Sequence, residues 1–149
     1  MQIDFHNTNK EGIIGATLVG DKIVFCAVRP IVIQSSEIMK VQTDLVLRVE
    51  DGFVLSISTH PDLAQRGAEL FPGLITVDSS ANSRPLEFPV KNNGRSTLNL
   101  MRQEIVAIGY VSEVQKIEIG EFEPELEPSP KDSRSRPQRK NPNIKFEVR

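Results

Sequence analysis

Turn-forming residues interrupt the first 120 residues so often that no stretch is left for a long helix. Between the turns lie short runs of β-branched and apolar residues, and several of them alternate with polar residues as half-buried strands do. One segment, 61–70, has room for a helical turn or two. Many short strands at this spacing are typical of an all-β sandwich, jelly roll or barrel. The strands that the pattern predicts are 23–28, 31–33, 41–49, 53–57, 74–77, 86–90, 97–100, 105–111 and 114–119.

One turn suggests how two of these strands are paired. Glu50-Asp51-Gly52 separates the alternating runs 41–49 and 53–57. An acidic residue followed by glycine between two alternating runs is a hairpin signal. We therefore expect these two strands to pair with each other.

The composition excludes several classes of protein. A chain of 149 residues is about one domain, and 18 basic against 20 acidic residues leave no excess of positive charge for nucleic acid. Aromatic residues make up 5% of the chain, with no Trp, which argues against stacking platforms for single strands. A single cysteine excludes a disulfide framework or a thiolate-rich metal site within one chain. The apolar runs are too short to span a membrane and no signal-peptide pattern appears, so we expect a soluble protein that is not secreted.

The C-terminal residues differ in composition from the rest. Prolines at 124, 128, 130, 137 and 142 exclude a continuous helix or a central strand there. From 128 to 149, seven basic residues and two acidic ones give a charge of +5, so residues 1–127 carry −7. We therefore expect a β domain over 1–120 and an extended, proline-rich, charged arm over 121–149.

The arm carries the residues that we expect to contact a partner. Its last seven residues alternate apolar and polar, which suits a short strand added to the edge of another sheet, in this chain or in a neighbour. Its basic residues could instead neutralise phosphates. We favour a solvated linker or a protein contact, because the acidic body would repel nucleic acid. The predicted contact residues are Arg134, Arg136, Arg139, Lys140, Ile144, Phe146 and Val148.

Two histidines occur in the chain, and one of them lies next to an acid. His60 and Asp62 could form a catalytic or metal-binding pair, but no cluster of further ligands accompanies them. A surface loop with its turn set by Pro61 is the favoured interpretation. No Ser-His-Asp arrangement has a supporting motif, and no glycine-rich loop that would cradle phosphate appears.

Three acids and the cysteine complete the candidates. Asp44, Asp51 and Asp78 could hold Mg²⁺, which needs one or two carboxylates, although acids of turns and strand ends are the favoured interpretation. Cys26 lies in the most apolar strand, which favours a buried small hydrophobe over a nucleophile. We therefore predict no catalytic, cofactor-binding or metal-binding residues.

The order of segments resembles the trimeric deoxyuridine triphosphatase (dUTPase) family over roughly residues 22–111. That family commonly shows V-x-T-D/G-h-x-h-x-h-P-x-G-h, where h is apolar, and here 41–53 reads VQTDLVLRVEDGF. Upstream, 33–37 occupies the place of an I-P-P-x-E-like turn. Downstream, 63–64 and 73–75 fall at the ends of the P-R-S-G-L-A and G-V-I-D motifs.

The functional residues that the resemblance implies are absent from the first two motifs. In the family, the carboxylate of G-Y-D-L helps to bind the metal that bridges the triphosphate. Val24 stands in its place here. The Arg-Ser-Gly that contacts phosphate corresponds to His60-Pro61-Asp62, and a carboxylate facing a triphosphate is repulsive.

The other three motifs lack most of the family's functional residues as well. In the third motif Thr76 replaces the water-activating Asp and Ser79 the stacking Tyr, while Asp78 keeps a non-catalytic acid position. The fourth, G-D-R-I-A-Q, reads as 102–107 and keeps only a core Ile, at 105. The fifth, a glycine-rich loop that closes over phosphates, has no counterpart, since no glycine follows Gly120.

The resemblance implies a dUTPase-like distorted jelly roll or β-barrel and a homotrimer, without the active site and without a cofactor. A fold kept without its site is retained for its surface, so we predict a structural protein and not an enzyme. We expect a trimeric decoration or cement subunit on a viral or phage capsid, because a trimer fits threefold positions of a shell. It would occur in the virion or the host cytoplasm. The alternatives are a regulatory protein-binding module and a divergent nucleotide hydrolase.

Overall fold

The computed structural model describes residues 3–115 and 117–124. The chain divides into two units, 1–115 and 116–149, and the helices and strands of the described residues all belong to the first. In the second unit, residues 117–124 form neither helix nor strand. No helix in the described part of the chain is long and apolar enough to cross a bilayer. The predicted contact residues of the arm, from Arg134 to Val148, lie outside the described residues.

The first unit is built from short strands, one short helix and one 3₁₀ turn. In chain order the elements are β1 (Ile3–Asn7), β2 (Ala16–Val19), β3 (Lys22–Cys26), β4 (Ile31–Ile33), β5 (Ile38–Val49), β6 (Phe53–Thr59), α1 (Pro61–Gln65), β7 (Ala68–Leu70), β8 (Leu74–Val77), η1 (Ser79–Ala81), β9 (Pro85–Asn92), β10 (Leu98–Leu100) and β11 (Ile105–Glu113).

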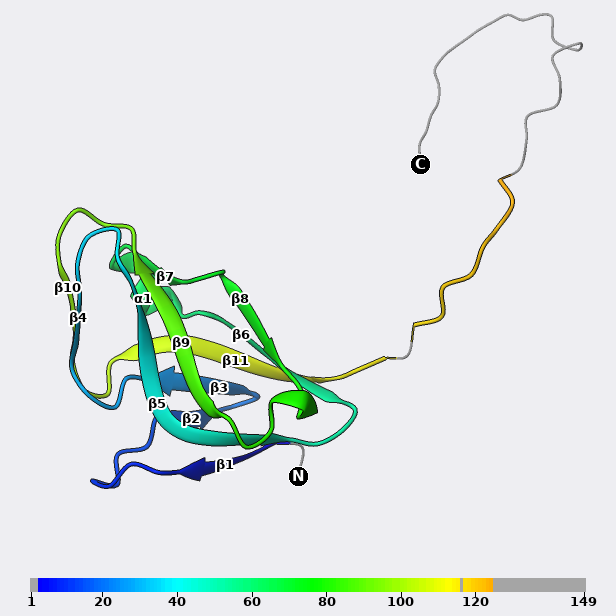
Figure 1. The fold of residues 1–149 in the computed structure, drawn as a ribbon, viewed down its shortest axis with the longest axis horizontal. Helices are drawn as coiled ribbons and strands as arrows, with labels where there is room; N and C mark the ends of the chain where they lie inside the picture. The colour runs from blue at the N-terminus through cyan, green and yellow to red at the C-terminus, as the bar shows by residue number, and fades with distance from the viewer. Residues whose placement is uncertain (1–2, 116, 125–149) are drawn as a thin grey trace, which may run out of the picture. The chain divides into compact units, whose positions relative to one another are not determined.

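The strands form two main antiparallel sheets and a small ribbon (Figure 1). One sheet has four strands in the order β1-β5-β9-β7, and the other has five in the order β2-β3-β11-β6-β8. β4 and β10 pair as a two-stranded ribbon at one end. The prediction of an all-β fold of the jelly-roll kind is confirmed.

The core lies between the inner faces of the two main sheets, and Phe25 of β3 is at its centre. Its ring is fully buried and meets the rings of Phe5 and Phe88 edge to face, with centroids 6.0 and 5.3 Å away. Gly109 of the neighbouring strand β11 lies under this ring. A Cβ at that position would come within 2.9 Å of the Phe25 ring and 3.0 Å of the Leu55 side chain. Glycine therefore lets β11 carry the central aromatic cluster without a clash.

The predicted hairpin between 41–49 and 53–57 is wrong. β5 belongs to the four-stranded sheet and β6 to the five-stranded one, so the turn carries the chain from one sheet to the other. The turn itself forms as expected: the Phe53 N–H donates to the Glu50 carbonyl at 3.1 Å, and Gly52 has a φ of 91°. Alternation shows only that each strand buries one face. Here the two buried faces meet each other across the core.

The predicted strand at 114–119 is also wrong. β11 ends at Glu113, and the residues of this segment that the structure describes are irregular. Val114, Ile117 and Ile119 are 54%, 80% and 94% exposed, so the apolar side chains of this segment are not buried as those of a strand in a sheet would be.

Three strands were missed by the sequence pattern. β1 and β2 precede the first predicted strand, and β7 lies in the segment 61–70, of which only Pro61–Gln65 is helical. β7 is three residues long, and its buried Ala68 and Leu70 flank an exposed Glu69. Such short alternations carry little signal in the sequence alone.

Adjacent residues of β5 test the two faces of the four-stranded sheet. Leu47 is buried in the core, whereas Val46 points to the outer face and is half-buried. We expect Leu47→Ala to lower the free energy of unfolding by about 2–5 kcal/mol, because it leaves a cavity. Val46→Ala is the matched control and should cost about 1 kcal/mol or less. Urea denaturation measures both. Equal losses would contradict the assignment of the two faces.

Candidate functional site

The most apolar large pocket of the first unit lies on the outer face of the five-stranded sheet. It has a volume of about 480 Å³, within the usual range of ligand pockets. Its lining comes from β2, β3 and β11, together with the loops that lead into β2, α1 and β11. The lining residues are Ile14, Thr17, Val19, Val24, Cys26, His60, Gln103 and Ile105.

This pocket brings together positions that the dUTPase resemblance placed in three different motifs. Val24 comes from the first motif, His60 from the second and Ile105 from the fourth. They are distant in sequence, and the antiparallel sheet joins them. Thr76 and Ser79, from the third motif, belong to β8 and η1 and do not line this pocket.

The prediction that Ile105 is the core residue of the fourth motif is wrong by one position. Ile105 is half-buried and faces the pocket, whereas Val106 is fully buried. The cause is an irregularity in the pairing of β11 with β3 between Ile105 and Ala107, which displaces the alternation. A shift of one residue then places Gln103 at the glycine of G-D-R-I-A-Q, and Gln103 has a left-handed φ of 71°. Glu104 takes the position of the aspartate.

Glu104 does not face the pocket but holds the loop beside it. One carboxylate oxygen accepts the backbone N–H of Met101 at 2.6 Å. The other pairs with the Arg66 guanidinium at 2.6 Å, and Arg66 also donates to the carbonyl of Asn99 at 2.7 Å. The acid thus fixes the chain between β10 and β11 to the end of α1.

His60 is the N-cap of α1. Its Nδ1 accepts the backbone N–H of Asp62 at 3.0 Å, and Pro61 occupies the first helical turn. The nearest Asp62 carboxylate oxygen lies 3.8 Å from Nδ1, too far for a hydrogen bond. The His60–Asp62 pair therefore ends a loop and begins a helix, and its Nδ1 is engaged by the backbone.

Cys26 differs from the prediction of a buried hydrophobe. The residue is only half-buried and opens on the pocket, where its Sγ lies 3.5 Å from the Ile14 carbonyl. Partial burial raises the pKa of the thiol, because it disfavours the thiolate. An activated cysteine needs the opposite shift, so this environment does not prepare Cys26 for nucleophilic attack.

The three acids that could have held Mg²⁺ do not share a site, and two of them have hydrogen-bond partners of their own. The Asp44 carboxylate pairs with Arg29 at 2.6 Å and accepts from the Asn9 amide at 3.0 Å. Asp78 caps η1, and Asp51 lies in the exposed turn between the sheets. Among residues 3–115 and 117–124, no three His, Cys, Asp or Glu side chains gather in a way that could hold a metal.

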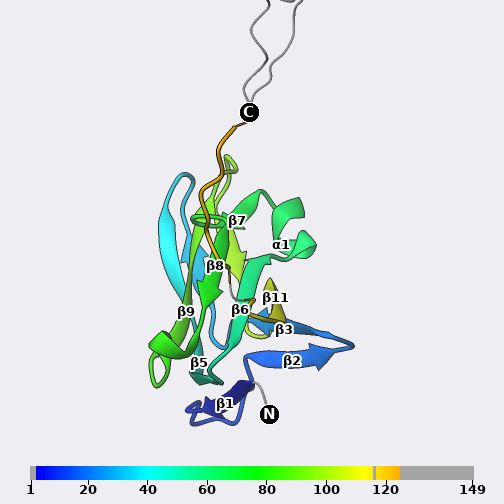
Figure 2. The same cartoon turned by 90° about the vertical axis from the view of Figure 1, so that its right-hand side faces the viewer.

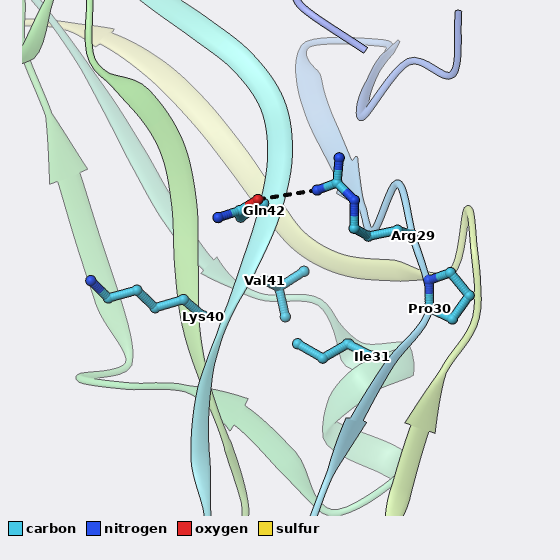
Figure 3. A pocket seen from close by; sticks show the side chains of 6 residues that line it. All are labelled: Arg29, Pro30, Ile31, Lys40, Val41 and Gln42. Atoms are coloured by element: carbon cyan, nitrogen blue, oxygen red, sulfur yellow. Dashed lines mark hydrogen bonds between the residues drawn. The ribbon is translucent and has the colours of Figure 1, made fainter. Parts of the chain in front are cut away.

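A second, smaller pocket of about 90 Å³ lies beside β4 and β5 (Figure 3). Val41 and Ile31 face one another in it, and the Arg29 guanidinium donates to the Gln42 side chain at 3.1 Å. Because Arg29 also pairs with Asp44, its charge is already matched within the chain. The volume is too small for a nucleotide.

We expect the Cys26 thiol to react slowly with iodoacetamide near pH 7. Its raised pKa lowers the thiolate fraction below that of a free cysteine. The alkylation rate, followed by mass spectrometry, should rise when the same protein is unfolded in urea. A native rate equal to or above the unfolded rate would contradict the environment described.

Ser80 should control the titration of Asp78. The Ser80 hydroxyl donates to the Asp78 carboxylate at 2.5 Å, and this bond, more than the backbone N–H of the same residue, lowers the pKa of Asp78. We expect Ser80→Ala to raise that pKa toward its ordinary value, measured by NMR titration of the carboxyl carbon. Because the pKa of Asp78 is lower in the folded than in the unfolded protein, this hydrogen bond stabilises the fold near neutral pH. The stabilisation is lost as the pH falls through the folded-state pKa. No change on substitution would rule out the hydroxyl as the main cause.

No protein-family model and no curated protein matches this sequence. Solved structures do match its fold. The dUTPase of EIAV superposes with a TM-score of 0.66 at 14% identity, covering 81% of this chain and 96% of that one. The dUTPase of Streptococcus mutans gives 0.66 at 16% identity, with 79% and 99% covered. The dUTPase of Staphylococcus bacteriophage 80alpha gives 0.70 at 10% identity, with 84% and 98% covered. At these identities the likeness concerns architecture: this chain has a dUTPase-like fold.

Proposed function

We propose that this chain is a non-enzymatic protein on a dUTPase-like fold, a homotrimer that serves as a structural subunit of a larger assembly. The main support is the composition of the pocket in which Val24, His60 and Ile105, from three of the dUTPase motifs, come together. Its lining contains no carboxylate, lysine or arginine. A nucleoside triphosphate carries several negative charges, and a mainly apolar wall without lysine, arginine or carboxylates for a bridging metal offers little to replace the water around them.

The surroundings of the pocket support the same proposal. The side chains that could have carried chemistry are bonded to the protein itself: His60 caps a helix and Glu104 pairs with Arg66. Thr76, at the position of the water-activating acid, has a hydroxyl that does not act as a general base near neutral pH. These losses are independent of one another, and together they remove metal binding, phosphate binding and water activation.

The assembly that we propose is a viral or phage capsid, with this protein as its decoration or cement subunit in the virion or the host cytoplasm. Support comes from symmetry and from the sequence of the arm. A trimer matches the local threefold positions of a shell. The arm, 121–149, combines prolines, a basic stretch and a final alternation of apolar residues, which suits a segment that clasps a neighbouring chain.

A second candidate function is a regulatory module that binds one soluble protein. The observation in its favour concerns a structural neighbour, the bacteriophage 80alpha dUTPase: phage dUTPases control transfer of virulence genes by a proto-oncogenic G protein-like mechanism. An apolar, concave surface such as the pocket is also of the kind that receives protein side chains.

The first test is dUTP turnover by the full-length protein with Mg²⁺. We expect no hydrolysis above the buffer rate, because the pocket offers no carboxylate to hold Mg²⁺ or to activate the water. The 80alpha enzyme serves as the positive control. Turnover at a rate comparable with that control would establish the hydrolase alternative instead.

The second test separates the two binding roles. Full-length protein and a version ending at Glu127 are used as baits in a lysate of the natural source, and retained proteins are identified by mass spectrometry. We expect a shell or other assembly protein to be retained only when residues 128–149 are present. One soluble partner held equally by both baits would favour the regulatory role.

A further inference from the structure

A polar pocket of about 460 Å³ lies beside the loop that follows β1, and the proposed function makes no use of it. Its volume is within the usual range of ligand pockets. The described residues that line it all differ from those of the apolar pocket on the five-stranded sheet. Figure 2 shows β1 at the bottom of the view, below β2. Among the described residues that line the polar pocket only Val28 is apolar, so its wall suits a polar ligand.

Three cationic side chains from distant parts of the chain line this pocket. Lys10 belongs to the loop between β1 and β2, Arg29 to the turn between β3 and β4, and Arg102 to the loop between β10 and β11. Two acids, Glu11 and Asp44, line it as well, so its charge is +1. The first unit as a whole has ten basic and thirteen acidic residues, or −3. The pocket is therefore a local positive site on an acidic unit, and such a site attracts anions.

Asp44 and Arg29 hold each other in place. Oδ2 of Asp44 accepts from the Arg29 guanidinium at 2.6 Å and from the Asn9 side-chain amide at 3.0 Å. The guanidinium also donates to the Gln42 side chain at 3.1 Å (Figure 3). These bonds use two of the five N–H donors of a guanidinium, and the other donors and Oδ1 of Asp44 have no hydrogen-bond partner among the described residues. A bound molecule therefore meets donors and an acceptor that are already positioned.

The backbone at Asp44 is unusual for a strand. Its φ of 56° lies in the left-handed region, and the pairing of β5 with β9 is irregular between Gln42 and Leu45. The backbone N–H and the hydroxyl of Thr8 both donate to the Asp44 carbonyl, at 2.8 and 3.0 Å. Irregularities of this kind re-aim a side chain and are over-represented beside functional sites. Here the irregularity lies where the Asp44 carboxylate enters the wall of the pocket.

Lys10 and Arg102 supply positive charge that the chain itself uses little. The guanidinium of Arg102 lies 3.6 Å from the Glu11 carboxylate, too far for a hydrogen bond, and the two side chains are 51% and 66% exposed. Lys10 has no ion pair among the described residues. The loop that carries Lys10 is nevertheless fixed, because Oδ1 of Asn9 accepts the backbone N–H groups of Glu11 and Ile13 at 2.9 and 3.0 Å.

We propose that this pocket binds a small organic phosphate whose body is hydroxylated and not aromatic, as in a sugar phosphate. Lys10 and Arg102 hold the phosphate through charge-assisted hydrogen bonds, which are stronger than those between neutral groups. The hydroxyl groups of the body donate to Oδ1 of Asp44 and accept from the remaining donors of Arg29. A nucleobase is a poor fit, because the described lining contains no aromatic side chain on which it could stack. This inference does not depend on the proposed structural role.

The test is a titration of the isotope-labelled full-length protein with glucose 6-phosphate, followed through the backbone amide signals in NMR spectra at low ionic strength. Glucose, inorganic phosphate and uridine monophosphate are the comparison ligands. We expect glucose 6-phosphate to shift the amides of 8–11, 28–29, 44 and 102 in a saturable way. Inorganic phosphate should bind the same residues at least about tenfold more weakly and glucose should not bind, because each has only one of the two recognised parts.

Two arginine variants decide whether the pocket is the site. Arg102→Gln removes one of the two available cations, and Arg84→Gln is the matched control, since Arg84 is exposed in the turn before β9 and does not line the pocket. We expect the affinity for glucose 6-phosphate to fall at least about tenfold in Arg102→Gln and to be unchanged in Arg84→Gln. The amide spectrum of each variant shows whether it is folded, and Lys10→Gln repeats the test at a second exposed side chain.

Each other outcome would overturn a stated part of the inference. Wild-type affinity in a folded Arg102→Gln, or shifts confined to residues outside the pocket, would overturn the site. Equal affinities for inorganic phosphate and glucose 6-phosphate would overturn the role of the hydroxylated body. Tighter binding of uridine monophosphate at the same amides would overturn the class of ligand.

Discussion

The core depends on the Phe25 ring, which packs over Gly109 of its own sheet and against two aromatic rings of the opposite sheet. The Phe25 ring fills the space over β11 that any larger residue at position 109 would occupy, and it receives the edges of Phe5 and Phe88 from the opposite sheet. Because this cluster is made of inner-face side chains alone, it sets the sandwich without using the outer faces. The outer faces can therefore differ in composition without disturbing this cluster.

This separation lets the residues of the outer face vary while a dUTPase-like fold is kept. The pocket positions Val24 and Cys26 alternate with the core residues Ile23 and Phe25 along one strand. Changing the outward residues alters what the sheet can bind, while the inward ones continue to hold the sandwich together. Fold and function thus reside on opposite sides of the same backbone, which is why likeness of architecture at 10–16% identity says little about activity.

Alternation in the sequence predicted the all-β class and most of the long strands, because burial of every second residue is a local property. It could not tell which strands pair. β5 and β6 alternate on either side of a turn with glycine, yet each buries its inner face against the other instead of sharing a ladder. The pocket could not be predicted either. The sequence pattern did not reveal β2, and the change of facing at Ile105 is visible only in the register of β11 with β3. The sequence also does not show which polar residues pair. Glu104 and Arg66, for example, are thirty-eight residues apart.

Several polar side chains at or near the motif positions are hydrogen-bonded within their own loops. A catalytic or metal-binding group must keep lone pairs or protons free for the substrate. Here Nδ1 of His60 accepts a backbone N–H, Glu104 accepts from Met101 and Arg66, and Asp78 accepts from Ser80. Each group accepts a backbone N–H of its own loop, and in this way His60 and Asp78 begin helical turns and Glu104 closes one. The loops around the pocket are thereby held in place by polar bonds, while the surface that they frame is left apolar.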